Sequence, residues 1–293
     1  MSTSTLNTCT SGARPASPAL GDTLYETDTK RIIVYDGAVW RIYNNDGIAY
    51  NTAGTGELHY PSGIFSSSSA SYYISTNPEL HFDAKYIDGA DAANNPADAG
   101  SVASWSNRSG ASTSYTATQS TGSATPVFTA TGDGSKPTVT FDGGDYLDLA
   151  NLYEPSSFSF IVVSKSDDAS KVGVFGWNGA WQNTIWWKYS ANSSDSVTGV
   201  YSVGDYSSPE NFSMHVVTRS GTSVSFYENG GSALWTGTSS ATMKLGRIGG
   251  SQLGNHDGNI SEILVFDSAL STSDLNVVRN YVSNKYGITT TSF

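Results

Sequence analysis

The sequence has a single cysteine and few charged residues. Cys9 stands alone among 293 residues, which excludes a disulfide framework within the chain. Charged side chains make up 14% of the chain, against roughly 25% in an average globular protein. The 26 acidic residues outnumber the 15 basic ones and give a net charge of −11. This excess argues against nucleic acid or an anionic membrane as the main partner.

Two kinds of apolar segment are also missing. No run approaches the roughly 20 apolar residues that a helix needs to span a bilayer. The N-terminal segment MSTSTLNTCTSGARP has neither the basic region nor the apolar region of a signal peptide. We therefore expect a protein that is made in a cytoplasm, is not exported by a leader and does not insert into a membrane.

The residues that are abundant favour β structure. The chain has 30 glycines and 12% aromatic residues, a mixture that suits strands and tight turns. From residue 79 to 267, strand and turn signals alternate at a spacing typical of a two-sheet antiparallel sandwich. Phe158–Ser164 is apolar on both faces, which predicts a central strand. Thr138–Leu149 is predicted to form a hairpin around Gly143 and Gly144.

The segment 258–288 predicts a strand followed by one short helix. Ile260–Phe266 is rich in branched and aromatic residues. Ser271 is a good N-cap, Asp274 stands at the capping-box position, and Gly287 is placed to end the helix. Apolar residues recur between them at helical spacing and predict one buried stripe of Leu275, Val278, Tyr281 and Val282.

Three motifs of the C-terminal part resemble those of the laminin-G-like (concanavalin A-like) jelly rolls. They are YVSNKYG at Tyr281–Gly287, KLGRIGG at Lys244–Gly250 and GNISE at Gly258–Glu262. The resemblance covers about residues 79–290. It implies an all-β fold, a jelly-roll sandwich of two antiparallel sheets with one short C-terminal helix. Lectins, hydrolases and adhesion modules share this fold, so it leaves the function open.

The N-terminal part is predicted to be a separate unit. Residues 21–50 contain three short strand signals, and Asp36-Gly37 between the last two favours a tight hairpin. Such a sheet is too small to be stable alone and needs a partner. Residues 1–20 are expected to form an extended arm, and residues 51–78 a Ser/Gly-rich linker with one strand near Ser71–Ile74.

This small unit resembles a module found near the N-termini of tailed-phage fibre and other virion proteins. The recurring pattern P-x-x-G-x-x-Y-x-T-D-T is met from Pro18 to Thr29, and Y-D-G-x-x-W from Tyr35 to Trp40. The resemblance implies a virion-attachment module whose candidate contact residues are Tyr25, Tyr35 and Trp40. The alternative is an ordinary hairpin that carries no information about location.

An aromatic-rich region is a candidate glycan-binding site. Sugar rings stack their C–H faces on exposed aromatic rings, and nearby polar groups order the hydroxyls. The candidate residues are Trp177, Trp181, Trp186, Tyr201 and Tyr206. The alternative is that these aromatics fill a concave face or an interface between subunits.

Calcium is the one candidate cofactor. The resemblance implies it, because laminin-G-like folds often hold an ion at the rim of the sandwich. The turn residues with suitable oxygen ligands are Asp142, Asp145, Asp148, Asn255 and Asp257. Solvated turn acids are the alternative interpretation.

Catalytic motifs are not found. A retaining glucanase on this kind of fold needs two neighbouring carboxylates, usually from an E-x-D-x-x-E-like strand, and no such spacing occurs. No G-x-S-x-G elbow is present, and the four histidines lack metal-ligand spacing. His215 is expected to lie on a strand face. We predict that the protein is not an enzyme.

Together these observations predict a phage virion protein, either a tail fibre or spike or a capsid decoration. Its N-terminal part would bind other virion proteins, and its lectin-like jelly roll would adhere to host-surface polysaccharide through many weak contacts. A homotrimer is expected, because the N-terminal sheet is small. The first alternative is a capsid-decorating or cementing protein without glycan binding. The second is a polysaccharide-degrading enzyme.

Overall fold

The computed structural model describes residues 7–19, 22–26, 31–35, 40–43, 49–51, 65–67, 70–72, 78–109, 115–167, 172–176, 185–187, 196–197, 200–201, 211–240, 242–251 and 254–293. The chain divides into two compact units, Met1–Asn77 and Pro78–Phe293. Each unit has sheets and a core of its own.

The N-terminal unit contains a five-stranded sheet whose strands follow chain order. The strands are β1 (Asn7–Cys9), β2 (Thr23–Glu26), β3 (Arg31–Tyr35), β4 (Trp40–Tyr43) and β5 (Ala49–Asn51). β1 pairs with β2 in parallel, and the other neighbours are antiparallel. The segment expected to be an extended arm therefore contributes β1 to the sheet.

The core of this unit is small. Leu24, Ile33 and Trp40 form a buried cluster, and Cys9 and Tyr35 pack against it. Asp36 and Gly37 lie outside the described residues, while Tyr35 and Trp40 on either side of them are paired across β3 and β4. The predicted linker contains the two-stranded sheet of β6 (Phe65–Ser67) and β7 (Ala70–Tyr72).

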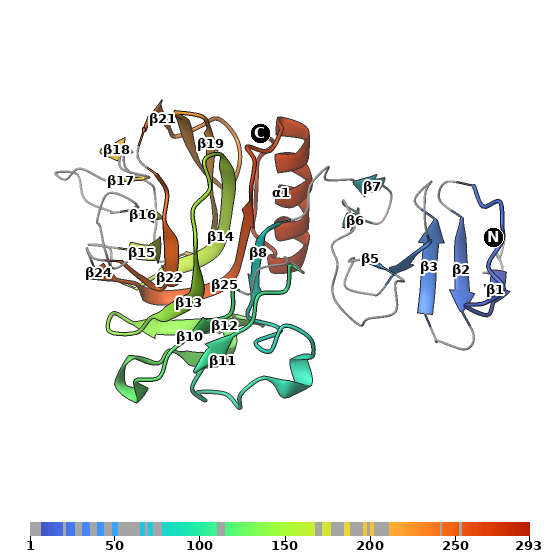
Figure 1. Cartoon of the computed structure of the whole chain (residues 1–293), viewed down its shortest axis with the longest axis horizontal. Helices are drawn as coiled ribbons and strands as arrows, with labels where there is room; N and C mark the ends of the chain where they lie inside the picture. The colour runs from blue at the N-terminus through green and yellow to red at the C-terminus, as the bar shows by residue number, and fades with distance from the viewer. Residues whose placement is uncertain are drawn as a thin grey trace. The chain divides into compact units, whose positions relative to one another are not determined.

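The C-terminal unit is a sandwich of two sheets, as predicted (Figure 1). In the described part of the chain, sheet I has the order β11-β12-β25-β14-β19-β20-β21, and β8 also pairs with β25. Its strands are β8 (Leu80–Asp83), β11 (Val127–Asp133), β12 (Lys136–Asp142), β14 (Phe158–Ser166), β19 (Ser213–Ser220), β20 (Ser223–Glu228), β21 (Trp235–Thr238) and β25 (Asp257–Phe266).

Sheet II has the order β18-β17-β16-β15-β22-β13-β10-β9. Its strands are β9 (Ser104–Trp105), β10 (Ala117–Thr118), β13 (Leu147–Tyr153), β15 (Val172–Gly176), β16 (Ile185–Trp187), β17 (Ser196–Val197), β18 (Val200–Tyr201) and β22 (Leu245–Ile248). The remaining elements are the strands β23 (Gly250–Ser251) and β24 (Gly254–Asn255) and the 3₁₀ turns η1 (Ala92–Asn94) and η2 (Gly122–Ala124).

The prediction of a hairpin over Thr138–Leu149 is wrong. β12 pairs with β11 and β25 in sheet I, whereas β13 pairs with β10 and β22 in sheet II. The turn that contains Gly143, at a φ of 82°, carries the chain from one sheet to the other. Phe141 before the turn and Leu147 after it are buried in the same core. The two strands therefore face each other across the core and do not pair edge to edge.

The predicted central strand is confirmed. β14 lies between β25 and β19 in sheet I. One of its faces, which includes Phe160 and Val162, belongs to the core between the sheets. The other face includes the buried residues Ile161 and Val163. That outer face of sheet I lies under α1, as Figure 1 shows.

The helix α1 (Thr272–Tyr286) begins and ends where its capping residues predict. Ser271 Oγ accepts a hydrogen bond from the backbone N–H of Asp274 at 3.1 Å. Gly287 adopts the left-handed conformation that closes the helix, with φ of 72°. The predicted apolar stripe is buried, and Val277 is buried with it.

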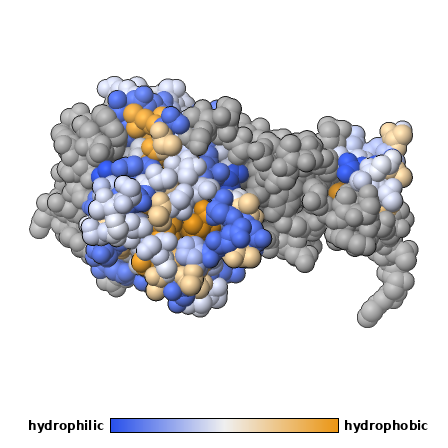
Figure 2. Space-filling model, turned by 60° about the horizontal axis from the view of Figure 1, so that its bottom comes forward, coloured by the Kyte–Doolittle hydropathy of each residue, from blue (hydrophilic) through white to orange (hydrophobic). Residues whose placement is uncertain are grey.

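The face of the molecule drawn in Figure 2 shows no single large apolar patch in its described part. In Figure 2 the apolar colour on the face in view forms small separate patches among polar ones. The large apolar side chains that the described residues expose are Leu152 and Leu234. Within the same residues, no helix is both long and apolar enough to cross a bilayer.

Candidate functional site

A buried polar network lies on the outer face of sheet I, beneath α1. Its members come from β8, from the segment that follows β9, from β25 and from α1. They are His81, Asp83, Arg108, Glu262, Tyr281, Lys285 and Tyr286. The sequence places them far apart, and the fold brings them together.

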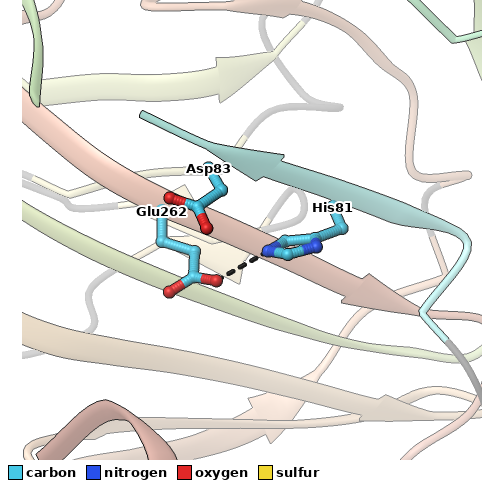
Figure 3. A group of neighbouring side chains, drawn as sticks. All are labelled: His81, Asp83 and Glu262. Carbon is cyan, nitrogen blue, oxygen red and sulfur yellow. Dashed lines mark hydrogen bonds and ion pairs between the residues drawn. The ribbon is translucent and has the colours of Figure 1, made fainter. Parts of the chain in front are cut away.

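The alternation of β8 explains the position of two members. Leu80 and Phe82 point into the core between the sheets. His81 and Asp83 therefore point to the outer face. Asp83 is the register partner of Glu262 on β25. Figure 3 shows both β8 side chains extending toward Glu262.

The carboxylate of Glu262 accepts hydrogen bonds from four side chains. Its Oε1 lies 2.6 Å from His81 Nε2 and 2.7 Å from the hydroxyl of Tyr281. Its Oε2 lies 3.1 Å from Lys285 Nζ and 2.9 Å from the hydroxyl of Tyr286. This carboxylate therefore connects β25 to both β8 and α1.

The carboxylate of Asp83 is held by two cations and one backbone group. Its Oδ2 lies 2.9 Å from Arg108 Nη1 and 2.8 Å from Lys285 Nζ. Its Oδ1 accepts the backbone N–H of Lys85 at 2.9 Å. The guanidinium of Arg108 also stacks over the ring of Tyr86, with its Cζ 3.7 Å from the centroid.

Burial shifts the pKa values of the groups in this network. The side chains of Asp83 and Glu262 are 1% exposed and that of Lys285 is 19% exposed. Burial raises the pKa of Glu262, but Lys285 and the hydrogen bond from His81 outweigh it and hold that pKa well below its usual range. Burial lowers the pKa of His81, which Glu262 only partly opposes. We assign a neutral imidazole that donates Nε2–H to the Glu262 carboxylate.

This assignment balances the charges. The carboxylates of Asp83 and Glu262 face the cations of Arg108 and Lys285, with His81 neutral. Removing one partner from such a set leaves a buried charge without compensation, which is far more costly than loss of a surface pair. The network therefore fixes the position of α1 on the sheet.

His81, Asp83 and Glu262 also have the spacing of a metal site, since one ligand atom from each lies within 4.8 Å of the others. However, Lys285 Nζ contacts both carboxylates, and Arg108 contacts Asp83. A divalent cation would have to enter beside two positive side chains. The donor set therefore does not fit a metal ion while Lys285 remains in place.

The aromatic glycan candidates fall largely outside the described residues. Trp177, Trp181 and Tyr206 lie outside them. Trp186 is in β16 and Tyr201 is in β18. These strands stand with β17 at one end of sheet II, beyond β15. The structure therefore places Trp186 and Tyr201 on strands at one end of sheet II, and the glycan site remains a prediction.

Of the calcium candidates, which were expected in turns, only Asp145 lies between strands, while the others lie in β12, β13, β24 and β25. Asp142 Oδ1 accepts the N–H of Gly144 at 2.8 Å, and Asp145 Oδ2 accepts the N–H of Asp142 at 3.2 Å. Burial and the neighbouring Asp142 raise the pKa of Asp145. Asp257 is the register partner of Asp142, and Asn255 pairs with Gly250 in the β23–β24 hairpin.

Other contacts bear on whether these acids could bind calcium. Asp148 is bound by Arg247 through two hydrogen bonds of 2.6 and 2.9 Å. Within the described residues, the calcium candidates do not form a cluster of three His, Cys or carboxylate groups at metal-ligand spacing. The calcium site stays a prediction, and no step in the function below depends on it.

The proposed attachment residues lie in the sheet of the N-terminal unit. Tyr25 is in β2 and is paired with Ile32. The rings of Tyr35 and Trp40 are 5.5 Å apart across β3 and β4. Trp40 is buried in the small core. Trp40 thus contributes to the stability of this unit, and attachment through the three residues remains a prediction.

The predicted strand-face histidine is confirmed. His215 is buried on β19, stacked on Phe226 at 6.1 Å between ring centroids, and its Nε2 lies 4.0 Å from Glu228 Oε1. Burial, with the nearby His256, lowers the pKa of His215 to about 3. Burial likewise lowers the pKa of His256 to about 4. Both imidazoles are therefore neutral at physiological pH.

No protein-family model matches the sequence, and no curated protein is significantly similar to it. The chain is similar in fold to domain 4 of AbnA, a GH43 extracellular arabinanase from Geobacillus stearothermophilus in complex with arabinotriose, at 16% identity and a TM-score of 0.44, over 69% of this chain and 98% of that one.

Two other solved structures are similar over part of their length. One is a GH54 α-L-arabinofuranosidase, with 12% identity and a TM-score of 0.47, over 63% of this chain and 51% of that one. The other is Trypanosoma rangeli sialidase, with 11% identity and a TM-score of 0.42, over 89% of this chain and 44% of that one. The chain thus spans about half the length of these two enzymes.

These comparisons correct one prediction. The protein was expected not to be an enzyme, but the solved structures similar to it come from glycoside hydrolases. The inference from missing motifs was too strong, because carboxylates of distant strands can meet without any local pattern. The carboxylates of Asp83 and Glu262, from two strands far apart in the sequence, lie within 4.8 Å of each other. The missing motifs therefore do not exclude catalysis.

The buried network was missed by sequence reasoning. His81 and Asp83 alternate with Leu80 and Phe82, which is the pattern of a strand with one solvent-facing side. The available signal was the helix itself, since a helix with a buried apolar stripe must cover something. A polar strand face opposite such a helix predicts paired charges beneath it.

Proposed function

We propose that this chain is a structural protein of a tailed-phage virion whose β-sandwich binds polysaccharide on the host surface. The sequence pattern from Pro18 to Trp40 supports the virion role, because it resembles a module of phage fibre proteins. The all-β sandwich supports the binding role, since such a fold presents long strand edges and loops to ligands.

The observation that carries the binding proposal is the position of β16, β17 and β18. These three short strands form the outermost part of sheet II. The sequence between Gly176 and Glu210, which includes these strands, contains four tryptophans and three tyrosines. An aromatic-rich segment at a sheet edge offers stacking surfaces to sugar rings without a deep pocket.

Weak single contacts suffice if several copies act together. The core of the N-terminal unit is built around Leu24, Ile33 and Trp40. So few buried apolar side chains give a sheet little stability of its own. Association of several copies would stabilise this unit and multiply the sandwiches on one particle. A homotrimer that is attached through the N-terminal unit meets both needs.

The full-length protein tests the proposal in two assays. The first is binding to an array of bacterial surface polysaccharides, with release of reducing ends measured on the same samples. The second is co-sedimentation with phage particles from which this protein has been stripped. We expect retention on at least one polysaccharide and firm association with particles.

The other outcomes separate the alternatives. Association with particles without binding to any polysaccharide would indicate a capsid-decorating protein. Release of reducing ends from the bound polysaccharide would make the sandwich a hydrolase that also adheres. Absence of both interactions would contradict the proposal.

A further inference from the structure

The amine of Lys285 lies between two buried carboxylates. Its Nζ is 2.8 Å from Asp83 Oδ2 and 3.1 Å from Glu262 Oε2. Each of these carboxylate side chains is 1% exposed. An amide condensation needs an amine, a carboxyl group and a base. Lys285 supplies the amine here, and the two buried carboxylates in contact with it supply the carboxyl group and the base.

We propose that Lys285 and Asp83 condense to form an intramolecular isopeptide bond between α1 and β8, with Glu262 as the base. Glu262 Oε2 takes a proton from Lys285 Nζ and so frees the nitrogen lone pair. Nζ attacks Cγ of Asp83, and a tetrahedral intermediate forms. The Nζ–Cγ bond remains, one Cγ–O bond breaks, and the protons released from Nζ leave with that oxygen as one water molecule.

The overall change needs no further reactant. One ammonium and one carboxylate give one amide and one water, and Glu262 ends as the carboxylate that it was at the start. The charges also stay balanced. Before the reaction Asp83 and Glu262 face Lys285 and Arg108, and afterwards Glu262 and Arg108 remain as one anion and one cation.

The surroundings of Asp83 suit the intermediate. Negative charge develops on the carboxyl oxygens as Nζ attacks. Oδ1 accepts the backbone N–H of Lys85 at 2.9 Å, and Oδ2 accepts Arg108 Nη1 at 2.9 Å. Donors that are already in place stabilise such charge without reorganisation. Arg108 therefore neutralises the carboxylate of Asp83 before the reaction and stabilises the negative charge of the intermediate.

Water exclusion favours the amide over its hydrolysis. The buried reactants leave little room for the water that would reverse the reaction. The side chain of Lys285 is 19% exposed, and this partial exposure gives the released water a way out. The bond would join positions that are 202 residues apart and fix α1 to the first strand of the sandwich.

Mass spectrometry of the full-length protein decides the matter. We expect the intact chain to be lighter than its sequence by one water molecule after denaturation. Proteolysis should then yield one branched peptide in which the Asp83 segment is joined to the Lys285 segment. The Lys285→Arg variant keeps the positive charge but not the amine, and should show the full mass and two separate peptides.

Lys244→Arg is the matched control, because Lys244 also pairs with a carboxylate, 3.0 Å from Glu154, but at the surface. This variant should keep the branched peptide. Wild-type protein of full mass without a branched peptide would overturn the proposal. A loss of water that maps to any other pair of residues would overturn it as well.

Discussion

Two regions of the sandwich carry unusual side chains, and they differ in their place in the fold. Beneath α1, charged side chains such as Glu262 and Asp83 are 1% exposed and bound on all sides. At the far end of sheet II, the short strands β16 to β18 stand at an edge in an aromatic-rich stretch. The first region holds α1 on sheet I, and the second is where we propose that polysaccharide binds.

The largest effect that separates the two regions is expected from Glu262→Gln. The substitution leaves Lys285 and Arg108 with one anion fewer in a buried site. We expect a loss of roughly 3–5 kcal/mol in the free energy of unfolding, measured by urea denaturation. Polysaccharide binding by the fraction that remains folded should not change. A loss below about 1 kcal/mol would show that the network is dispensable.

Acid should destabilise the protein through histidines outside the network. Unfolded imidazoles take up protons near pH 6.5, whereas the pKa of His256 in the folded state is about 4 and that of His215 about 3. The unfolded state therefore binds protons first as the pH falls. The contribution of the two neutral histidines to the free energy of unfolding is fully present above about pH 6.5. It declines toward pH 4, by on the order of 3 kcal/mol per histidine.

Urea denaturation at several pH values between 7.5 and 4 measures this slope. A His256→Gln variant should show a shallower slope, whatever its stability at pH 7.5. The network should respond differently, because the lowered pKa of Glu262 keeps it charged across this window and its contribution is lost only below about pH 4.5. A stability that does not change between pH 7 and pH 4.5 would contradict the account of the histidines.

A smaller effect is expected at the start of the helix that covers the network. Ser271→Ala removes the hydroxyl that accepts the N–H of Asp274. We expect a loss of about 1 kcal/mol in unfolding free energy, with thermal unfolding as the check. The Ser271→Asp variant restores an N-cap acceptor and should recover most of the loss. If both variants behave alike, the cap contributes little.

The smallest effect should come from a surface ion pair. Glu154 and Lys244 lie 3.0 Å apart, with side chains 44% and 27% exposed. Glu154→Gln should change the unfolding free energy by less than about 1 kcal/mol, since solvent screens this pair. It is the matched control for Glu262→Gln. Equal losses of unfolding free energy in Glu154→Gln and Glu262→Gln would contradict the claim that the buried ion pairs contribute more to stability than the exposed one.

The parts of the fold that local signals specify were predictable from the sequence. The ends of α1 follow from Ser271 and Gly287, because caps act within one turn of the helix. The central strand follows from the run Phe158–Ser164, because both of its faces are apolar. The all-β sandwich follows from the spacing of such runs.

Long-range pairing could not be predicted in this way. The turn at Gly143 looks the same to local reasoning whether it closes a hairpin or passes between sheets. Asp83 and Lys285 are 202 positions apart, and no local pattern relates them. His81 and Asp83 have the spacing of a solvent-facing strand side, and only the packing of α1 reveals that they are buried.

The central claim is that the aromatic-rich segment binds polysaccharide. The most direct test compares the binding of immobilised polysaccharide by the full-length protein and by its Trp177→Ala/Trp181→Ala variant. Each stacking contact contributes roughly 0.5–1.5 kcal/mol, so the loss of two contacts should weaken binding by about fivefold or more. Its unfolding midpoint should equal that of the wild type. The Leu234→Ala variant, which shortens an exposed apolar side chain elsewhere, should bind normally. Equal affinity of the tryptophan variant and the wild type would contradict a glycan site that includes Trp177 and Trp181.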